Sequence, residues 1–274
     1  MSNTFFMKAV GKLIGTVTKK EYITPHYIRI HLHSNDVPSF AAATIGDNNK
    51  IAIPPKGLNE VHFPEFDQET AQFIYPPQHL APVIRTYTHR SINLDTNEIA
   101  IDFVDHGDGG PASEWARNAL AGSKLGVMMK LEKKELHPLV NWYLLAGDAT
   151  AIPVLSAILE TLPETAKGIC IIEVHGKADE QLLKTKANID FIWLHNEAPH
   201  IKSNLAKTVE AMAIPDHLTK FGYVAAEFSN VKQIRNYLRK EKNWTQQELY
   251  AYSYWKAGVA EDASQKERRA EKEA

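Results

Sequence analysis

The sequence predicts two domains: an antiparallel β-barrel or β-sandwich, followed by a doubly wound α/β domain whose parallel sheet has about five strands. Three observations support this fold class. The chain has 274 residues, enough for two hydrophobic cores. Its first half contains short runs that alternate between apolar and polar residues, whereas its second half contains continuous apolar runs separated by helical patterns. We place the boundary in the polar stretch "LEKKELHP", which gives domains 1–138 and 139–274.

Three stretches of the first half read as strands. "YIRIHLH" (27–33) and "EIAIDFV" (98–104) alternate strictly, and "NKIAIPP" (49–55) is a further candidate. Turns rich in Gly, Asn, Asp and Pro separate these runs, which favours an antiparallel barrel or sandwich.

A long stretch between these strands, residues 54–83, contains six prolines and four aromatic residues, Phe63, Phe66, Phe73 and Tyr75. Long irregular segments are uncommon unless they cover a site or are disordered. The aromatic content favours a packed flap over a site.

The second half alternates strands with helices. Continuous apolar runs indicate strands buried on both faces, as in a parallel sheet. Helical patterns separate them, and in the last one Ser229 is the expected N-cap. The expected strands are "WYLLAG" (142–147), "ICIIEV" (169–174), "DFIWLH" (190–195), "GYVAA" (222–226) and "LYAYSY" (249–254), and the expected helices are "AIPVLSAILETL" (151–162), "ADEQLLKT" (178–185), "NLAKTVEAM" (204–212) and "SNVKQIRNYLRKE" (229–241).

Composition limits the classes of function. The 31 Lys and Arg nearly balance the 33 Asp and Glu, so general attraction to nucleic acid or to an anionic membrane is not expected. No apolar run has the length of a signal peptide or a membrane helix. The single cysteine, Cys170, cannot form an internal disulfide and reads as a core residue of a protein in a reducing compartment. We therefore expect a cytoplasmic monomer, with an exposed or disordered charged tail over 261–274.

The hexapeptide "RTYTHR" (85–90) concentrates cations, hydroxyls and a phenol at a strand end. Because side chains alternate between the two faces of a strand, these groups could hold one anionic, ring-bearing ligand from several directions. An ordinary edge strand is the alternative interpretation.

Two strand-to-helix turns suit phosphate. "HGDGGPAS" (106–113) follows a strand and places Pro111 at a helix start, where unpaired amides and the helix dipole attract anions. "AGDATAIP" (146–153) is a second such turn, although the G-x-G-x-x-G fingerprint is absent. Plain connecting turns are the alternative in both places. His31 and His33 share a strand face but lack the further ligands of a closed metal site, so we expect no metal.

Together with the late "YSYWKAGVAED" (252–262), these motifs resemble the siderophore-interacting proteins, a branch of the ferredoxin reductase superfamily that reduces ferric siderophores with FAD and NAD(P)H. The resemblance spans nearly the whole chain. It implies a flavin-binding β-barrel at 1–138 and a nicotinamide-nucleotide domain at 139–274.

The resemblance also implies roles for individual residues. Thr88 would lie beside flavin N5, where hydride is accepted, and is the expected catalytic residue. Three lysines, Lys50, Lys130 and Lys256, match the basic positions that bind the siderophore. The implied cofactor-binding residues are Arg85, Thr86, Tyr87, Thr88, Asp102, Val104, His106, Gly109, Gly110, Ala112, Ser113, Asp148, Thr150, Ala151 and Trp255.

The function implied is a ferric-siderophore reductase, with FAD as cofactor and NADH, NADPH or a reduced ferredoxin as donor. Family members often carry Arg where this chain has the three Lys, and their Trp-Leu-His-Arg run is "WLHN" here, which leaves the donor open. The alternatives are a general NAD(P)H-flavin or ferredoxin reductase, a non-catalytic siderophore carrier, and an unrelated nucleotide-binding protein.

Overall fold

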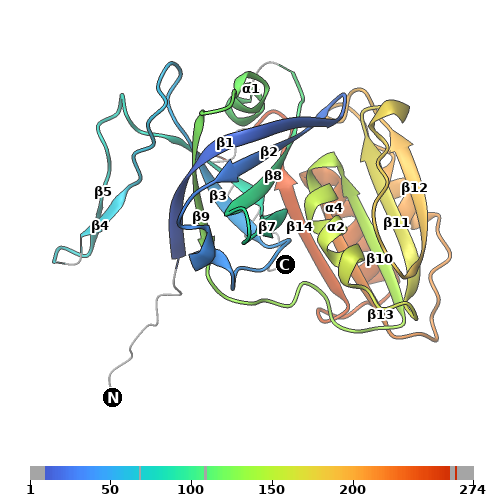
Figure 1. Cartoon of the computed structure of the whole chain (residues 1–274). Helices are drawn as coiled ribbons and strands as arrows, with labels where there is room; N and C mark the ends of the chain where they lie inside the picture. The colour runs from blue at the N-terminus through green and yellow to red at the C-terminus, as the bar shows by residue number, and fades with distance from the viewer. Residues whose placement is uncertain (1–9, 68, 108–109, 260–262, 264–274) are drawn as a thin grey trace. The chain divides into compact units, whose positions relative to one another are not determined.

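The computed structural model describes residues 10–67, 69–107, 110–259 and 263. By its internal contacts the chain divides into two compact units (Figure 1). Unit 1 comprises Met1–Ile23 and Tyr27–Lys134, and unit 2 comprises Thr24–His26 and Glu135–Ala274.

Unit 1 is built on a seven-stranded antiparallel sheet that curves as a half-barrel, as predicted for the first domain. The strands lie in the order β6-β3-β9-β1-β2-β8-β7. One helix, α1 (Pro111–Asn118), follows β8 and begins at the expected proline. The strands are β1 (Val10–Thr24), β2 (Tyr27–His33), β3 (Asn48–Ile53), β6 (Val83–Thr88), β7 (Ser91–Asn93), β8 (Glu98–Val104) and β9 (Lys124–Lys130), and a 3₁₀ turn, η1, spans Val37–Phe40.

The core of unit 1 follows the alternation of its strands. In β2, the alternate residues Ile28, Ile30 and Leu32 are fully buried, and they pack with apolar residues from β3, β8 and β9. On β8, however, Ala100 and Asp102 are buried as well, so this strand is covered on both faces. A polar residue is therefore buried where alternation alone predicts an outward side chain.

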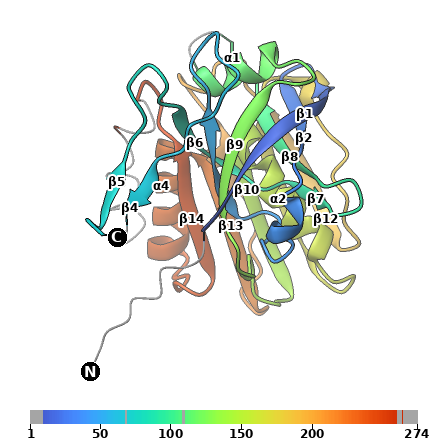
Figure 2. The ribbon, with the colours of Figure 1, turned by 60° about the vertical axis from the view of Figure 1, so that its left-hand side comes forward.

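Residues 54–83 differ from the expected packed flap. They contain a separate two-stranded hairpin, β4 (Glu65–Asp67) with β5 (Gln72–Ile74), which projects from the seven-stranded sheet (Figures 1 and 2). Phe66, Phe73 and Tyr75 are 39%, 53% and 70% exposed, so the prediction of a packed flap was wrong for these three rings. Only Phe63 packs against the sheet, at Gly126, where a side chain would have no room.

Unit 2 contains the predicted parallel sheet of five strands, in the order β12-β11-β10-β13-β14. Every pair in it is parallel, and the central strand β10 is buried along its whole length. The strands are β10 (Trp142–Asp148), β11 (Lys167–Val174), β12 (Asn188–His195), β13 (Lys220–Glu227) and β14 (Leu249–Trp255). The helices are α2 (Ile152–Thr161), α3 (Leu205–Glu210) and α4 (Phe228–Asn236), which continues as a π-helical turn, η4 (Tyr237–Glu241).

Helices cover both faces of this sheet. Leu144 and Ala146 of β10 pack with residues of α3 and α4. Val231, Ile234 and Leu238, which share one stripe of the helical pattern 229–241, belong to the same cluster. Gly147 points to the opposite face, where a Cβ would lie 3.3 Å from Leu155 of α2. The arrangement is doubly wound, as the sequence predicts.

Two local predictions in unit 2 were wrong. The pattern "ADEQLLKT" forms no α-helix: a 3₁₀ turn, η3 (Lys177–Asp179), is followed by irregular chain in which Leu182 is 95% exposed. Ser229 is not the N-cap of α4, because Glu227 is, and the Glu227 carboxylate accepts a hydrogen bond from the Ser229 amide. The charged tail from 261 lies outside the described residues, apart from Ala263.

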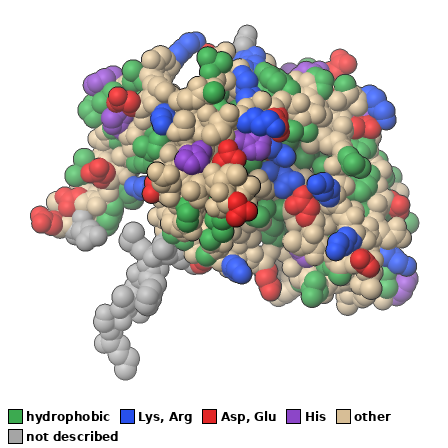
Figure 3. Space-filling model, in the orientation of Figure 1, with side chains coloured by type: hydrophobic (Ala, Val, Ile, Leu, Met, Phe, Trp, Pro, Cys, Tyr) green, Lys and Arg blue, Asp and Glu red, His purple; other side chains and the backbone are tan. Residues whose placement is uncertain are grey.

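The mixed surface charges and the buried cysteine are what the sequence composition predicts. In the view of Figure 3, acidic and basic side chains are interspersed. Cys170 is fully buried in β11, and burial raises the pKa of its thiol far above the ordinary value. Among the described residues, no helix is long and apolar enough to cross a membrane.

Candidate functional site

The hexapeptide at 85–90 forms most of β6 and the corner after it. The Tyr87 ring packs on the core of unit 1, with its centroid 4.7 Å from that of Phe103. Arg85 pairs with Ile51 of β3 and is half-buried, whereas Thr88 is only 6% exposed. The strand therefore presents a guanidinium and a phenol ring on one face, with a buried hydroxyl at its end.

The opposite face of the same strands carries two of the three predicted substrate lysines. Lys50 pairs with Thr86 on β6 and with Met128 on β9, and its ammonium donates a hydrogen bond to the Thr86 hydroxyl. Lys130 lies two residues beyond Met128 on β9, so Lys50 and Lys130 share this outer face. Diagonal neighbours of this kind lie about 7 to 8 Å apart. Lys256 belongs to unit 2, and its grouping with the other two remains our prediction.

The glycine turn after β8 is held by one carboxylate. Asp105 Oδ1 accepts hydrogen bonds from the Gly107 amide at 3.2 Å and from the Ser113 hydroxyl at 3.0 Å. Gly110 lies against the His106 ring, so that a side chain at 110 would overlap it. Gly109 lies outside the described residues.

This turn fits a phosphate group by its backbone rather than by its side chains. The Ser113 hydroxyl is already bonded to Asp105, and Ser113 is 1% exposed. Gly107 has a φ of +81° and open space around its missing side chain. Helix α1 begins with Gly110 as its N-cap and has Ala112 in its first turn. These small residues leave the helix amides accessible, and a bound diphosphate requires such access.

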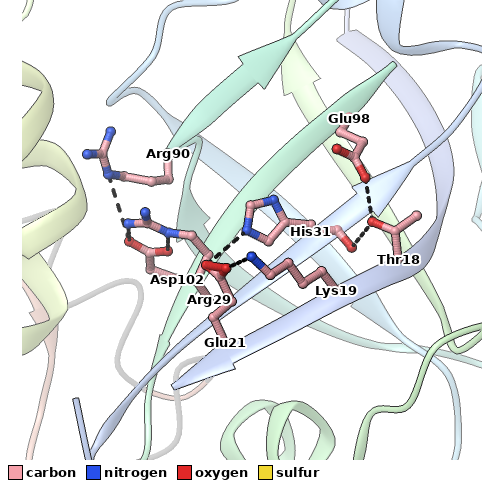
Figure 4. Close-up of polar contacts among 8 residues, drawn as sticks. All are labelled: Thr18, Lys19, Glu21, Arg29, His31, Arg90, Glu98 and Asp102. Carbon is pink, nitrogen blue, oxygen red and sulfur yellow. Dashed lines mark hydrogen bonds and ion pairs between the residues drawn. The ribbon is translucent and has the colours of Figure 1, made fainter. Parts of the chain in front are cut away.

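Asp102 is held inside a charged network on β2 and β8 (Figure 4). Its side chain is fully buried, and Arg29 binds it in a bidentate manner, through Nε at 2.6 Å and a terminal nitrogen at 2.8 Å. Tyr27 donates a further hydrogen bond at 3.1 Å, and the Nε of Arg90 lies 3.9 Å away. Burial and the nearby carboxylate raise the pKa of the Tyr27 phenol.

Two expectations are affected by this network. In the sequence Arg29 reads as an ordinary solvated cation of its strand, and this reading was wrong, because its side chain is only 24% exposed and binds Asp102. The Asp102 carboxylate was predicted to bind the cofactor; because it is already engaged by Arg29 and Tyr27, contact with FAD remains a prediction. Val104, at the end of the same strand, is half-buried beside the turn. On the same sheet, His31 Nε2 lies 3.5 Å from Glu21 Oε2 (Figure 4). The described residues contain no cluster of His, Cys, Asp or Glu suited to a metal ion.

Two buried polar residues, one within the hexapeptide and one opposite it, were not predicted as site residues. His89 is 1% exposed and Asn49, opposite Tyr87, is 2% exposed. Neither ring nitrogen of His89 and neither amide atom of Asn49 has a hydrogen-bond partner. Burial without a partner lowers the pKa of His89 to about 4, so this ring is neutral near pH 7. Buried polar atoms without partners commonly mark a position that a ligand or water completes.

In unit 2 the predicted residues gather at the carboxyl end of the central strand. Asp148 ends β10; its Oδ1 accepts from the Thr150 amide at 2.9 Å and from the Thr150 hydroxyl at 2.5 Å. Its Oδ2 accepts from the Trp255 indole at 2.8 Å and from the Glu227 amide at 2.9 Å. Burial raises the pKa of Asp148, and these hydrogen bonds oppose the shift. Ala151 is fully buried in the turn that follows.

Glu227 is a second buried carboxylate at this edge, and sequence reasoning did not assign it. It ends β13 and is 7% exposed. Its Oε1 accepts from the Ala257 amide at 3.3 Å, and its Oε2 from the Ser229 amide at 2.6 Å. An acid directly before a helix at the end of a buried strand is the pattern that would have indicated it.

Asn196, which replaces the family's Arg in the run "WLHN", has a structural role inside unit 2. The Asn196 amide donates to Glu173 Oε2 at 2.9 Å and to the Lys202 carbonyl at 2.6 Å. Asn196 therefore stabilises the end of β12 and the loop after it. The neighbouring His195 forms a hydrogen bond through its Nε2 with Glu180 Oε1, at 2.9 Å.

An antiparallel flavin-type β-domain followed by a parallel nucleotide-type sheet defines the ferredoxin reductase-like class. Distant solved structures share this fold, among them phthalate dioxygenase reductase, with a TM-score of 0.55, 13% identity, and coverage of 89% of this chain and 68% of that chain. Two family models match within it: the siderophore-interacting FAD-binding domain over residues 16–129 and the siderophore-interacting protein over 140–258. The chain belongs to the siderophore-interacting protein family.

More similar proteins agree with this assignment. The ferric vibriobactin reductase ViuB of Vibrio cholerae is 32% identical over 251 residues, covering 91% of each chain. The crystal structure of the siderophore-interacting protein SipS from Aeromonas hydrophila has a TM-score of 0.81 and 25% identity, with 96% and 98% of the two chains covered. A siderophore utilization protein from T. fusca has the same TM-score and identity, with 92% and 95% covered.

Proposed function

We propose that this protein is a ferric-siderophore reductase, which passes electrons from NADH, NADPH or a reduced ferredoxin through FAD to chelated ferric iron. The observation that carries the proposal is β6, with Arg85 and Tyr87 on one face and Thr86 beside Lys50 on the other. The family model of an FAD-binding domain and the name of the relative from V. cholerae support it.

The residues of unit 1 suit FAD. Arg85 offers a guanidinium fork for a diphosphate, and the backbone of the turn 106–113 offers amides at a helix start. Tyr87 offers a ring already fixed against Phe103. Thr88 would place its hydroxyl by the redox-active ring, and the unpartnered atoms of Asn49 and His89 lie on the same part of the sheet.

When bound, FAD would supply the redox chemistry, since a flavin can take two electrons from a nicotinamide as hydride, or one at a time from a ferredoxin, and pass them on singly. The chain's own part is to hold the cofactor and to attract the substrate. Ferric iron is held tightly by anionic oxygen ligands and ferrous iron much less so, and reduction therefore releases the metal. No protein ligand to the iron is needed.

We assign substrate attraction to Lys50, Lys130 and Lys256. A lysine is a point charge on a flexible stem, so these residues would favour anionic complexes without reading their shape closely. In unit 2, the end of β10 with Asp148, Thr150 and Ala151 is our proposed region for the nicotinamide donor. Trp255 is proposed to cover part of the cofactor.

The experiment is anaerobic mixing of the reduced flavoprotein with ferric siderophores, recording flavin reoxidation while a ferrous chelator traps the product. Reoxidation with one ferrous ion per electron is expected, and reduction of the resting protein by NADH, NADPH or reduced ferredoxin identifies the donor. Purified protein that acquires no flavin spectrum on addition of FAD would indicate a carrier instead. A flavoprotein that is reoxidised by free flavin but not by ferric siderophores would indicate a general flavin reductase.

The substrate assignment has its own test. Replacing Lys50, Lys130 and Lys256 together by Ala should raise the Michaelis constant for a ferric catecholate at least tenfold, because the anionic complex loses the cations proposed to attract it. The matched control replaces the exposed Lys184, Lys186 and Lys232 by Ala and should change that constant less than twofold. If both triple variants behave alike, net charge matters and these three positions do not.

A further inference from the structure

Two buried carboxylates bracket Lys256. Asp148 accepts a hydrogen bond from the side chain of Trp255, the residue before the lysine, at 2.8 Å. Glu227 accepts one from the backbone of Ala257, the residue after it, at 3.3 Å. Both acids end neighbouring parallel strands, β10 and β13.

The last strand is irregular at this point. Ala226 pairs with Ser253 and Glu227 pairs with Trp255, so Tyr254 is an extra residue in β14. A bulge of this kind re-aims the side chains that follow it. Here Trp255 is the residue that reaches the Asp148 carboxylate, and the chain beyond it enters the turn that contains Lys256.

The turn itself is closed. The Val259 amide donates to the Lys256 carbonyl at 3.2 Å, and Gly258 has a φ of +71°, which a residue with a side chain rarely adopts. The Lys256 ammonium lies 4.7 Å from the centroid of the Phe228 ring, at the start of α4. Backbone, flanking residues and side chain are thus each held by unit 2.

We propose that Asp148 and Glu227 form a carboxylate clamp that positions Lys256 for the anionic substrate, and that Asp148 acts through the Trp255 indole. The inference rests on the proposed function, because it assumes that Lys256 attracts a ferric siderophore. It changes the part given to Asp148. Its two oxygens are occupied by Thr150, Glu227 and Trp255, so it is a positioning residue rather than a contact to the nicotinamide donor.

A charged anchor is suited to this task. Hydrogen bonds to an ionised acceptor are stronger than those between neutral groups, and an indole N–H can only donate. The rotamer of Trp255 is therefore coupled to one oxygen of Asp148. A loosened Trp255 would let Lys256 sample more positions, and attraction of an anion would weaken because the ammonium is less often in place.

The first test follows the indole itself. In the FAD-loaded protein, the Trp255 indole N–H is assigned by NMR as the signal lost in Trp255→Phe. In Asp148→Ala, which removes both acceptor oxygens, this N–H should exchange with solvent at least tenfold faster, while the signals of the other four tryptophans stay unchanged. Unchanged exchange at Trp255 would overturn the clamp.

The second test uses a redox-inert probe, gallium(III) tris-catecholate, and measures its dissociation constant with the oxidised flavoprotein. We expect Asp148→Asn, Trp255→Phe and Lys256→Ala each to weaken binding about fivefold. The control, Asp190→Asn, removes an exposed carboxylate from β12 and should leave binding unchanged. Trp255→Phe removes the indole donor but leaves Asp148 itself unchanged. It therefore still tests the clamp if Asp148→Asn folds poorly.

The double variant Asp148→Asn, Lys256→Ala decides whether the two residues act as one unit. If the clamp works through Lys256, the double variant binds the probe no more weakly than Lys256→Ala alone. A further fivefold loss would overturn the clamp while leaving the proposed function intact. Wild-type protein that does not bind the gallium complex would instead count against the substrate site itself, even if the indole exchange responds as expected.

Discussion

Asp102, within β8 of unit 1, and Asp148, at the end of β10 in unit 2, are both buried carboxylates, but they are stabilised differently. Asp102 is neutralised by a cation, because Arg29 grips it with two nitrogens. Asp148 is held by neutral donors, two of them backbone amides. The comparison indicates that Asp102 belongs to a structural ion pair, whereas Asp148 anchors a nearby side chain, that of Trp255.

The cost of losing each group should differ accordingly. Removing the acid from a buried ion pair leaves an uncompensated charge, whereas removing an acceptor from neutral donors leaves only unsatisfied N–H groups. Four variants test this comparison, in order of decreasing effect.

Asp102→Asn should have the largest effect on stability. Arg29 would keep a neutral partner but lose the opposite charge, at a side-chain exposure of only 24%. We expect the free energy of unfolding to fall by about 3 kcal/mol, measured by urea denaturation. The double variant Arg29→Met, Asp102→Leu should recover part of the loss, since the Arg29 charge is then removed together with its partner. Equal losses in the single and double variants would contradict the ion-pair account.

Asp148→Asn should lower the free energy of unfolding by about 2 kcal/mol. The Asn amide nitrogen would face an indole or backbone donor that an oxygen accepts in the wild type, leaving that donor unsatisfied. The measurement is the same denaturation series, with Asp190→Asn as the surface control. A loss as large as that of Asp102→Asn would mean that charge pairing does not distinguish the two sites.

His89 extends the comparison to a buried group with neither cation nor hydrogen bond. Its pKa falls to about 4 on folding from an ordinary value of 6.5, so the unfolded chain binds more protons as pH falls between these values. Stability should therefore decrease by about 1 kcal/mol between pH 7.5 and 5.5 because of this residue. His89→Phe should remove that part of the pH dependence, and His200→Gln, at an exposed position, should retain it. Parallel profiles for wild type and His89→Phe would refute the assignment.

Glu21→Gln should have the smallest effect. Glu21 lies beside Lys19 and His31 on the outer face of the sheet, and the Lys19 side chain is 62% exposed (Figure 4). Water and salt screen such a pair, so the expected loss is under about 0.5 kcal/mol and should vanish in added salt. A loss above about 1 kcal/mol would show that this cluster is coupled to Asp102.

Strand patterns carried most of the fold prediction. β2 and β8 were predicted over their full lengths because their apolar residues alternate, and the five parallel strands because both faces are apolar. Five strands were not predicted: β1, β7 and β9 of the seven-stranded sheet, and β4 and β5 of the hairpin. β1 ends in the charged run "TKKEYIT", which has no strand-like alternation, and its first half pairs with the distant strand β9.

The failed helix at 178–185 has a tertiary cause. Asp179 accepts hydrogen bonds from the backbone and ring of His26, 153 positions earlier in the chain, which ties the segment down at its start. The apolar residues that suggested a helix then find no surface to cover, as the exposure of Leu182 indicates. Local periodicity contains no information about such a contact.

The candidate site could be predicted only in part, because several of its contacts join residues that are distant in the sequence. The order of motifs could be read from the chain, and so could the strand positions of Arg85, Tyr87 and Thr88. The pairing of Arg29 with Asp102 depends on the register of β2 against β8, and the link from Asp148 to Trp255 joins residues 107 positions apart. These contacts decide which carboxylates are free to bind a ligand.

The buried Cys170 makes the chain convenient for spectroscopy. Because the only native thiol is inaccessible and its deprotonation is suppressed, a maleimide reagent would spare it under mild conditions. One cysteine introduced on the surface of each unit would then carry a dye or a spin label without background. Such a doubly labelled sample would measure the distance between the two units with and without FAD.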